Sequence, residues 1–251
     1  MILNPYRFAG GNAAAYIAEQ DVDSPLSRWL TPASGTAWDD DIVATGNDAT
    51  SVNTPTLGAA DPWAGTDGAF FERDNEEYVT APDSTSLDIT ADLTLECWIR
   101  VSSLPGGSLA GIVSKYVGGG NNRSYVCAVS STGFVNFSLS TSGSFQSANS
   151  INGTDDVSTG WHHIVCTFEP SVRQAIYVDG VLDTEKTSSV AASIYNSTAV
   201  FNIGLQFYAT GADSAAVSGY ELFDGELFAP TIYNTALSST RVAAHYDAAG
   251  I

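Results

Sequence analysis

Apolar and polar residues alternate along much of the chain, with the period of two that is typical of β-strands with one buried face. In the stretch 93–101 every odd-numbered position is apolar and three of the four even-numbered positions are polar. Similar runs predict strands at about 109–115, 123–130, 133–140, 161–169, 173–179, 199–205 and 219–233. Clusters of Gly, Asn and Asp separate these runs. Many short strands without interleaved helices predict an all-β, antiparallel sandwich.

The same alternation predicts the core. Successive side chains of a strand point to opposite sides, so each apolar set shares one face. The residues expected to face inward are Leu95, Cys97, Ile99, Ile164, Cys166, Phe168, Ile176 and Val178.

The two ends of the chain follow other patterns. Near the C-terminus, residues 240–246 have helical spacing, Ser238 or Ser239 can cap the helix and Gly250 lies just beyond its end. Residues 1–23 show no strand alternation, and the run 13–19 is too short for a stable independent helix. We therefore expect an N-terminal arm, 1–23, that becomes ordered on a second polypeptide, followed by one domain, 24–251. The apolar arm residues are Ile2, Leu3, Tyr6, Phe8, Tyr16 and Ile17.

The charge balance excludes several classes of partner. Nine Lys and Arg stand against 28 Asp and Glu, which gives the 251 residues a formal charge of −19. Such a surface repels phosphate backbones and anionic lipids, so we expect neither nucleic acid nor membranes as partners. The N-terminus has no basic region and no continuous apolar stretch, which predicts that it is not a signal peptide. Three cysteines are too few and too odd in number for a disulfide scaffold.

Two neighbouring segments identify the type of sandwich. The stretch 161–168 reads W-H-H-I-V-C-T-F, and 176–180 reads I-Y-V-D-G. This pair resembles the central hairpin of laminin-G-like, concanavalin-A-like jelly rolls, including the pentraxin branch. Further segments similar to this family are 29–40, 69–79, 93–99, 112–115, 223–227 and 232–238. The resemblance covers about 24–251 and implies a laminin-G-like β-sandwich, a fold shared by lectins, glycosidases, adhesion modules and structural proteins.

The resemblance also bears on cysteines and calcium. Cys97 and Cys166 fall at positions similar to the two bridged cysteines of pentraxins, which implies neighbouring sulfurs, with Cys127 elsewhere and unpaired. Related modules hold Ca²⁺ with loop oxygens at one edge of the sandwich. Leu205 and Phe207 stand where the family has consecutive acidic residues, so the resemblance implies at most a weak calcium site and no other cofactor. The matching oxygen ligands are Asn121, Asn122, Gln206 and Asp213.

Catalytic groups are not arranged for glycoside hydrolysis. A retaining glycosidase needs two carboxylates about 5–5.5 Å apart on one face. Asp224 and Glu226 share a face, but Glu221 points to the other, and the strand differs from that of laminarinase-type enzymes. His162 and His163 are adjacent and face opposite ways, so they cannot chelate one metal. We expect His163 to be structural and the chain not to be an enzyme.

Aromatic residues in predicted loops suggest a different chemistry, because their rings can stack on sugars. An alternative is that they pack on the rim of the sandwich or at a subunit interface. These residues are Trp38, Trp63, Phe145, Phe207 and Tyr208.

Two functions remain. The first is a non-enzymatic virion structural protein, such as a head-decoration, fibre or tail subunit, since the segment 1–8 resembles the start of bacteriophage virion proteins. It would assemble in the host cytoplasm with other virion proteins and copies of itself. The alternative is a lectin-like, carbohydrate-binding module that recognises surface glycans.

Overall fold

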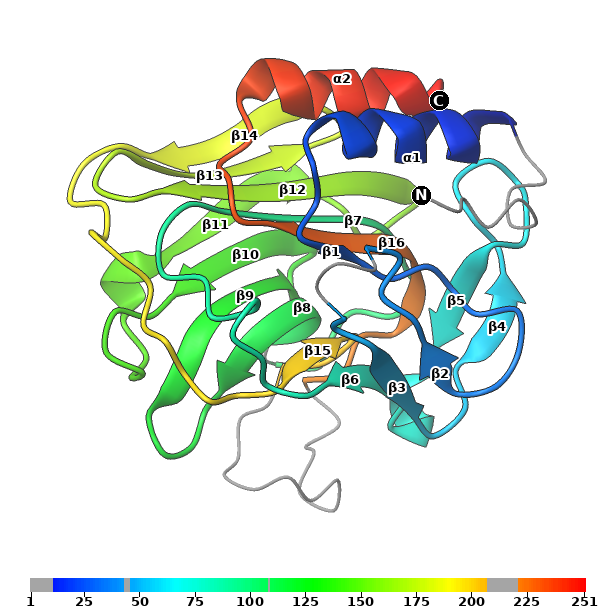
Figure 1. The fold of residues 1–251 in the computed structure, drawn as a ribbon, viewed down its shortest axis with the longest axis horizontal. Coiled ribbons are helices and arrows are strands. Elements are labelled where there is room, and N and C mark those ends of the chain that lie inside the picture. The colour runs from blue at the N-terminus through cyan, green and yellow to red at the C-terminus, as the bar shows by residue number, and fades with distance from the viewer. Residues whose placement is uncertain (1–10, 43–45, 108, 207–220) are drawn as a thin grey trace.

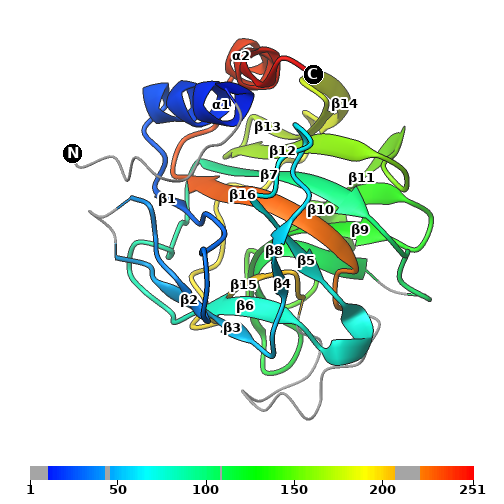
Figure 2. The ribbon, with the colours of Figure 1, turned by 90° about the vertical axis from the view of Figure 1, so that its right-hand side faces the viewer.

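The chain folds into two antiparallel sheets packed face to face, with a pair of helices on the outer side of one sheet (Figures 1 and 2). The computed structural model describes residues 11–42, 46–107, 109–206 and 221–251. The predicted all-β jelly-roll architecture is confirmed.

The first sheet has the strand order β14-β13-β12-β7-β16-β5-β4, and β1 pairs with β16. Its strands are β1 (Ser27–Arg28), β4 (Thr56–Ala59), β5 (Gly68–Phe71), β7 (Leu93–Val101), β12 (Trp161–Glu169), β13 (Arg173–Val178), β14 (Val181–Lys186) and β16 (Gly225–Tyr233). The second sheet has the order β11-β10-β9-β8-β15-β6-β3-β2. Its strands are β2 (Ala37–Trp38), β3 (Ala49–Val52), β6 (Tyr78–Ala81), β8 (Leu109–Val117), β9 (Asn122–Ser130), β10 (Phe134–Leu139), β11 (Ser150–Asp156) and β15 (Phe201–Ile203). Two short 3₁₀ helices are η1 (Arg73–Asn75) and η2 (Ser147–Asn149).

The main core lies between the sheets, where the inward faces interdigitate. All eight residues that the alternation predicts to face inward are buried there. Strand β12 pairs with β7 and β13 in register, with Ile164 opposite Cys97 and Val178. The apolar residues therefore recur at every second position because one face of each strand is buried between the sheets.

The outer face of the first sheet is also buried, because helices α1 (Gly11–Val22) and α2 (Ser239–Ala249) lie across it (Figure 2). The predicted C-terminal helix is α2, whose first turn is capped when the Ser238 hydroxyl accepts a hydrogen bond from the Arg241 N–H. Gly250 ends it with a φ of 62°. Neither of these two helices is long and apolar enough to cross a membrane.

The expectation of an arm that orders only on a second polypeptide is wrong for the part of 1–23 that the structure describes. Residues 11–22 form α1, and Tyr16 and Ile17 are buried on the chain's own sheet. Trp98 and Phe228 make the outer face of that sheet apolar, so a helix too short to persist alone is stabilised by burial there. The other arm residues, Ile2, Leu3, Tyr6 and Phe8, lie outside the described residues.

The cysteine prediction needs a similar correction. Cys97 faces Ile164, and Cys166 faces Leu95, so the two cysteines are diagonal rather than opposite on neighbouring strands. Diagonal positions are about 7–8 Å apart, beyond the span of a disulfide. Instead, the Sγ atom of Cys166 lies 3.4 Å from that of Cys127 on the facing sheet. All three cysteines are buried free thiols.

Candidate functional site

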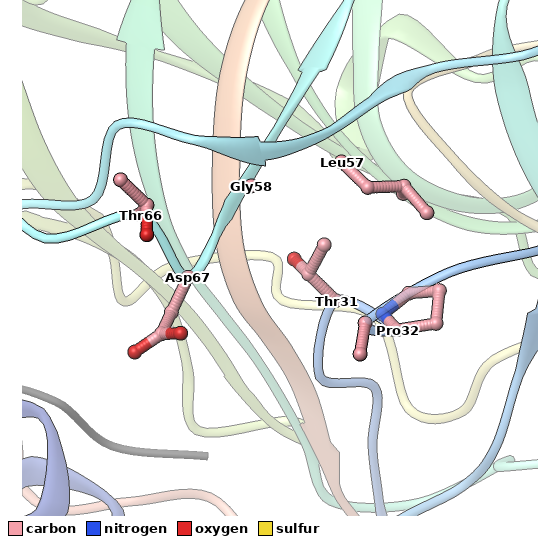
Figure 3. Close-up of a pocket in the computed structure, with 7 residues that line it drawn as sticks. Thr31, Pro32, Leu57, Gly58, Thr66 and Asp67 are labelled. Atoms are coloured by element: carbon pink, nitrogen blue, oxygen red, sulfur yellow. The ribbon is translucent and has the colours of Figure 1, made fainter.

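A pocket of about 250 Å³ opens beside strand β4, at one edge of the first sheet. Figure 3 shows Thr31 and Pro32 on one side of it and Thr66 and Asp67 on another, with β4 between them. The lining residues are Thr31, Pro32, Ala33, Leu57, Gly58, Thr66 and Asp67. At about 30 Å³ per water molecule in the liquid, this space would hold about eight waters.

The wall formed by β4 is shaped by an irregularity in its pairing with β5. The register shifts between Leu57 and Ala59, and Gly58 has a φ of 72°. A side chain at position 58 would be strained in this backbone conformation, and its Cβ would lie 3.6 Å from the carbonyl oxygen of Thr66. Glycine therefore keeps the wall flat at this point and leaves room for a ligand.

The wall next to β4 belongs to the turn 61–67, which is held by the buried carboxylate of Asp61. Its Oδ1 accepts hydrogen bonds from the backbone N–H groups of Trp63 (2.9 Å) and Gly65 (2.8 Å). Its Oδ2 accepts one from the N–H of Asp67 (3.3 Å). An aspartate that accepts from the following backbone stabilises such a turn, so Asp61 fixes the positions of Thr66 and Asp67 in the pocket.

The chemistry of this lining suits a ligand rich in hydroxyl groups. Threonine hydroxyls can donate and accept hydrogen bonds, and the carboxylate of Asp67 accepts them. Pro32 and Leu57 supply apolar surface for the carbon face of such a ligand. The described lining residues include no cysteine, serine, lysine or histidine and a single carboxylate. These described residues therefore supply groups for binding and do not form an acid–base pair.

The two predicted sugar-stacking tryptophans pack against other parts of the domain, Trp38 fully buried and Trp63 partly buried. Trp38 is 2% exposed and lies in the core between the sheets, beside Phe71. Trp63 packs on the outer face of the first sheet, and its Nε1–H donates to the carbonyl oxygen of Ala249 (2.6 Å). The sequence around each tryptophan lacks strand alternation and therefore looks like a loop, but each ring packs against elements far away in the chain.

Phe145 is the predicted stacking residue that the structure does place at the surface, with 59% of its area exposed. Tyr195, which the sequence does not single out, is 39% exposed. Its ring packs against Gly143, where a Cβ atom, if present, would lie 3.0 Å from the Cε1 atom of Tyr195. Both rings belong to loops that lie beside the β8–β9 turn, since Gly143 and Ser144 contact Arg123 and Asn121 and the Tyr195 N–H donates to the carbonyl oxygen of Ser140. Phe207 and Tyr208 lie outside the described residues.

The predicted calcium ligands are not brought together. Asn122 stands opposite Val117 at one end of β8, whereas Gln206 lies against Gly111, six residues along the same strand. This separation corresponds to about 20 Å. The side-chain oxygens of Asn121 and Asn122 accept hydrogen bonds from Ser144 and Thr198. Asp213 lies outside the described residues, and within the described ranges no group of three His, Cys, Asp or Glu side chains could hold a metal ion.

A second cluster of chemically active residues lies under the helices, around the buried carboxylate of Glu96. Tyr16 and His163 bind its Oε1, each at 2.8 Å, and Tyr233 donates to its Oε2 at 2.8 Å. The Nδ1 atom of His245 lies 3.1 and 3.2 Å from the two oxygens. These five residues come from β7, α1, β12, β16 and α2, so one carboxylate joins both helices to three strands.

The electrostatics of this cluster follow from its burial. Burial alone would raise the pKa of Glu96, but the charge of His245 and the hydrogen bonds from the histidines hold it well below its usual range. For His245, burial lowers the pKa, but the charges of Glu96 and Asp23 and the hydrogen bonds to both carboxylates together outweigh burial and raise it. Burial and the charge of Glu96 raise the pKa of Tyr16 and Tyr233.

This cluster links the two helices to the sheet and is buried away from solvent. Glu96, His163 and His245 are fully buried, and none of them lines the pocket beside β4. The prediction that His163 is structural agrees with its contact to Glu96. Glu226, one of the carboxylates that the sequence analysis compared with those of glycosidases, forms an ion pair with Arg100.

A sequence model of the concanavalin A-like lectin/glucanases superfamily matches residues 73–243. The chain belongs to this superfamily. No curated protein sequence matches the chain.

The fold is similar to that of several toxin binding domains. The binding domain of paraclostridial mosquitocidal protein 1 superposes with a TM-score of 0.66 at 15% identity, over 89% of this chain and 52% of that one. A botulinum neurotoxin type C structure, described as entering cells through two ganglioside molecules, has a TM-score of 0.66 at 14% identity, over 92% and 52%. The binding domain of botulinum neurotoxin DC in complex with SialylT gives 0.63 at 14%, over 90% and 52%. The chain thus spans about half the length of these domains.

Proposed function

We propose that this protein is a non-catalytic carbohydrate-binding module that holds a sugar unit in the pocket beside β4. The lining of that pocket carries the proposal, because it combines two threonine hydroxyls and a carboxylate with the apolar surfaces of Pro32 and Leu57. A few placed polar groups on an otherwise apolar concave surface are typical of sites that bind small polar ligands.

The similar toxin domains support this proposal at the level of fold. Two of them are described with a sialylated ligand or with gangliosides. Since this chain aligns with about half of each, their ligands do not transfer to particular residues here. The pocket therefore supplies the argument at the level of residues.

A glycan array followed by titration calorimetry tests the proposal. We expect Thr66→Val, which replaces a hydroxyl by a methyl of similar shape, to weaken binding of the best ligand by about two- to tenfold, because one hydrogen bond contributes about 0.5–1.5 kcal/mol. Thr187→Val is the matched control, since Thr187 is exposed and follows β14 at the opposite edge of the first sheet. Equal effects of the two variants, or no glycan bound, would contradict the proposal.

The expectation of a virion head-decoration, fibre or tail subunit stays a prediction. Its main argument is the N-terminal arm, and residues 11–22 of that arm pack on the chain's own domain. A virion protein that recognises surface glycans would combine both functions.

Light scattering of the purified protein tests the virion role. A structural subunit is expected to form a homo-oligomer, whereas a free carbohydrate-binding module is expected to be a monomer.

A further inference from the structure

We propose that Cys127 and Cys166 form a disulfide that joins the two sheets of the sandwich when the chain folds in an oxidising solution. The two cysteines belong to β9 and β12, which lie in different sheets. The bond is a covalent link across the core, and it makes the stability of the fold depend on the redox state of the surroundings.

The two sulfur atoms are in contact in the reduced protein. The Sγ atom of Cys166 lies 3.4 Å from that of Cys127, and a disulfide bond is about 2.05 Å long. The sulfurs therefore have to approach by about 1.4 Å, a distance that side-chain rotation and small strand movements can cover. Disulfides between facing sheets occur in other β-sandwiches, so the spacing of the two layers is compatible with such a bond.

The third thiol is directed elsewhere. The Sγ atom of Cys97 lies 3.3 Å from the carbonyl oxygen of Trp98 and 3.6 Å from that of Phe228, on the neighbouring strand β16. Cys97 thus donates to backbone oxygens, whereas the thiol of Cys166 donates to sulfur. Cys97 and Cys166 are also diagonal on β7 and β12. The geometry therefore selects Cys127 as the partner of Cys166.

Burial decides when the bond can form. Cys127 and Cys166 are 2% and 0% exposed, among the apolar side chains of the main core. Burial raises the pKa of the Cys166 thiol well above its ordinary value, and only a deprotonated sulfur attacks a disulfide. An external oxidant therefore reaches the pair while the chain folds or when the sandwich opens, and the folded, reduced protein reacts slowly.

The oxidant is a small disulfide such as oxidised glutathione. The thiolate of one cysteine attacks it, which releases one glutathione thiolate and leaves a mixed disulfide on the protein. The sulfur of the second cysteine then displaces the other glutathione. One S–S bond breaks in the oxidant and one forms in the protein. Two electrons pass from the cysteines to glutathione, and the two protons that the cysteines lose are taken up by the released thiolates.

The bond stabilises the fold because it restricts the unfolded chain. The two cysteines that close the loop are 39 positions apart in the sequence. For a loop of this length in a protein of this size, the constraint is expected to raise the Tm by roughly 10 °C. Reduction of the bond should remove this gain.

Oxidative refolding of the whole chain tests the proposal. The protein is unfolded in urea and refolded with oxidised and reduced glutathione, and its remaining thiols are alkylated. Trypsin leaves both cysteines in one peptide, 124–173, so a second protease that cuts before Asp155 is used to separate them. We expect peptides linked through Cys127 and Cys166, with Cys97 alkylated. Three alkylated cysteines, or a link through Cys97, would overturn the proposal.

Thermal unfolding of three variants checks the consequence of the bond. The oxidised protein should melt roughly 10 °C above the same protein reduced with dithiothreitol. This difference should vanish in Cys127→Ala and in Cys166→Ala. It should persist in Cys97→Ala, the matched control, because Cys97 is buried to the same extent as Cys127. Each variant is compared with its own reduced form, so a general loss of stability cancels. A linked protein that melts no higher than the reduced one would overturn the inference of a stabilising bond.

Discussion

At the scale of single residues, the charge state of His245 follows from its two partners. Its Nδ1 atom faces Glu96 at 3.1 Å, and its Nε2 atom faces Asp23 at 2.8 Å. A neutral imidazole has one N–H group, so only the protonated ring can donate to both carboxylates. Arg241 also binds Asp23, while His163, Tyr16 and Tyr233 face Glu96 from their own elements. The imidazolium is thus the positive charge that keeps a buried carboxylate ionised.

This arrangement predicts how stability depends on pH. The pKa of His245 is raised from its ordinary value of 6.5, so its stabilising contribution is complete below that pH and is lost as the pH rises through the native pKa. Urea denaturation at a series of pH values should show the free energy of unfolding falling on the alkaline side, and this fall should be smaller in His245→Gln. His162, whose pKa the hydrogen bond to Asp179 raises, contributes equally to both proteins. Parallel pH profiles of the two proteins would contradict the prediction.

The sequence was sufficient to predict which residues face the core of the sandwich, but it did not predict the cluster around Glu96. Leu95, Cys97 and Ile99 follow a period of two, and that period alone selects their face. Glu96 occupies an even position of the same strand, where a polar residue normally indicates contact with water. Its burial depends on two helices at opposite ends of the chain, which no local pattern records. For the same reason the pocket, assembled from 31–33, β4 and 66–67, was missed.

At the scale of elements, α1 illustrates how tertiary packing overrides local preference. The helix has 12 residues, at the lower limit for helices in water. Arg241 of α2 binds Glu19 at 2.6 Å and Asp23 at 2.8 Å, and so links the C-terminus of α1 to the second helix. The helix is therefore a component of the domain, joined to it by apolar contact and by charge.

Substitution of Tyr16 should show how much α1 contributes. Its ring is fully buried against Trp63 and Trp98, and its hydroxyl donates to Glu96. We expect Tyr16→Ala to lower the free energy of unfolding by about 3–5 kcal/mol, the usual cost of removing a buried aromatic side chain. Ala18→Ser, on the exposed side of the same helix, is the control and should change it by less than about 0.5 kcal/mol.

Urea titrations of both variants would measure these differences. If Tyr16→Ala were as stable as the original chain, the helix would contribute little to the domain, and the contact with a second polypeptide expected from the sequence would become the better explanation for its apolar residues.

At the scale of the whole molecule, internal ion pairs and net charge have opposite effects. In the ion pairs of Arg28 with Asp21 and of Lys115 with Asp83 the cation is buried, so the protein shields these pairs from salt more than it shields exposed charges. The excess of 19 negative charges is spread over the surface and destabilises the compact state through self-repulsion. Salt screens exposed charges more than buried ones, so the two contributions can be separated by experiment.

We therefore expect the protein to become more stable as salt is added. Between 10 mM and 500 mM NaCl the Debye length falls from about 30 Å to a few Å, which removes most of the repulsion between surface carboxylates and leaves the buried pairs nearly unchanged. Relief of about 1 kcal/mol would raise the Tm by roughly 2–4 °C in a protein of this size. Calorimetry at pH 7 measures this shift. A Tm that falls with NaCl would mean that surface ion pairs such as Arg173 with Glu185 outweigh the net charge.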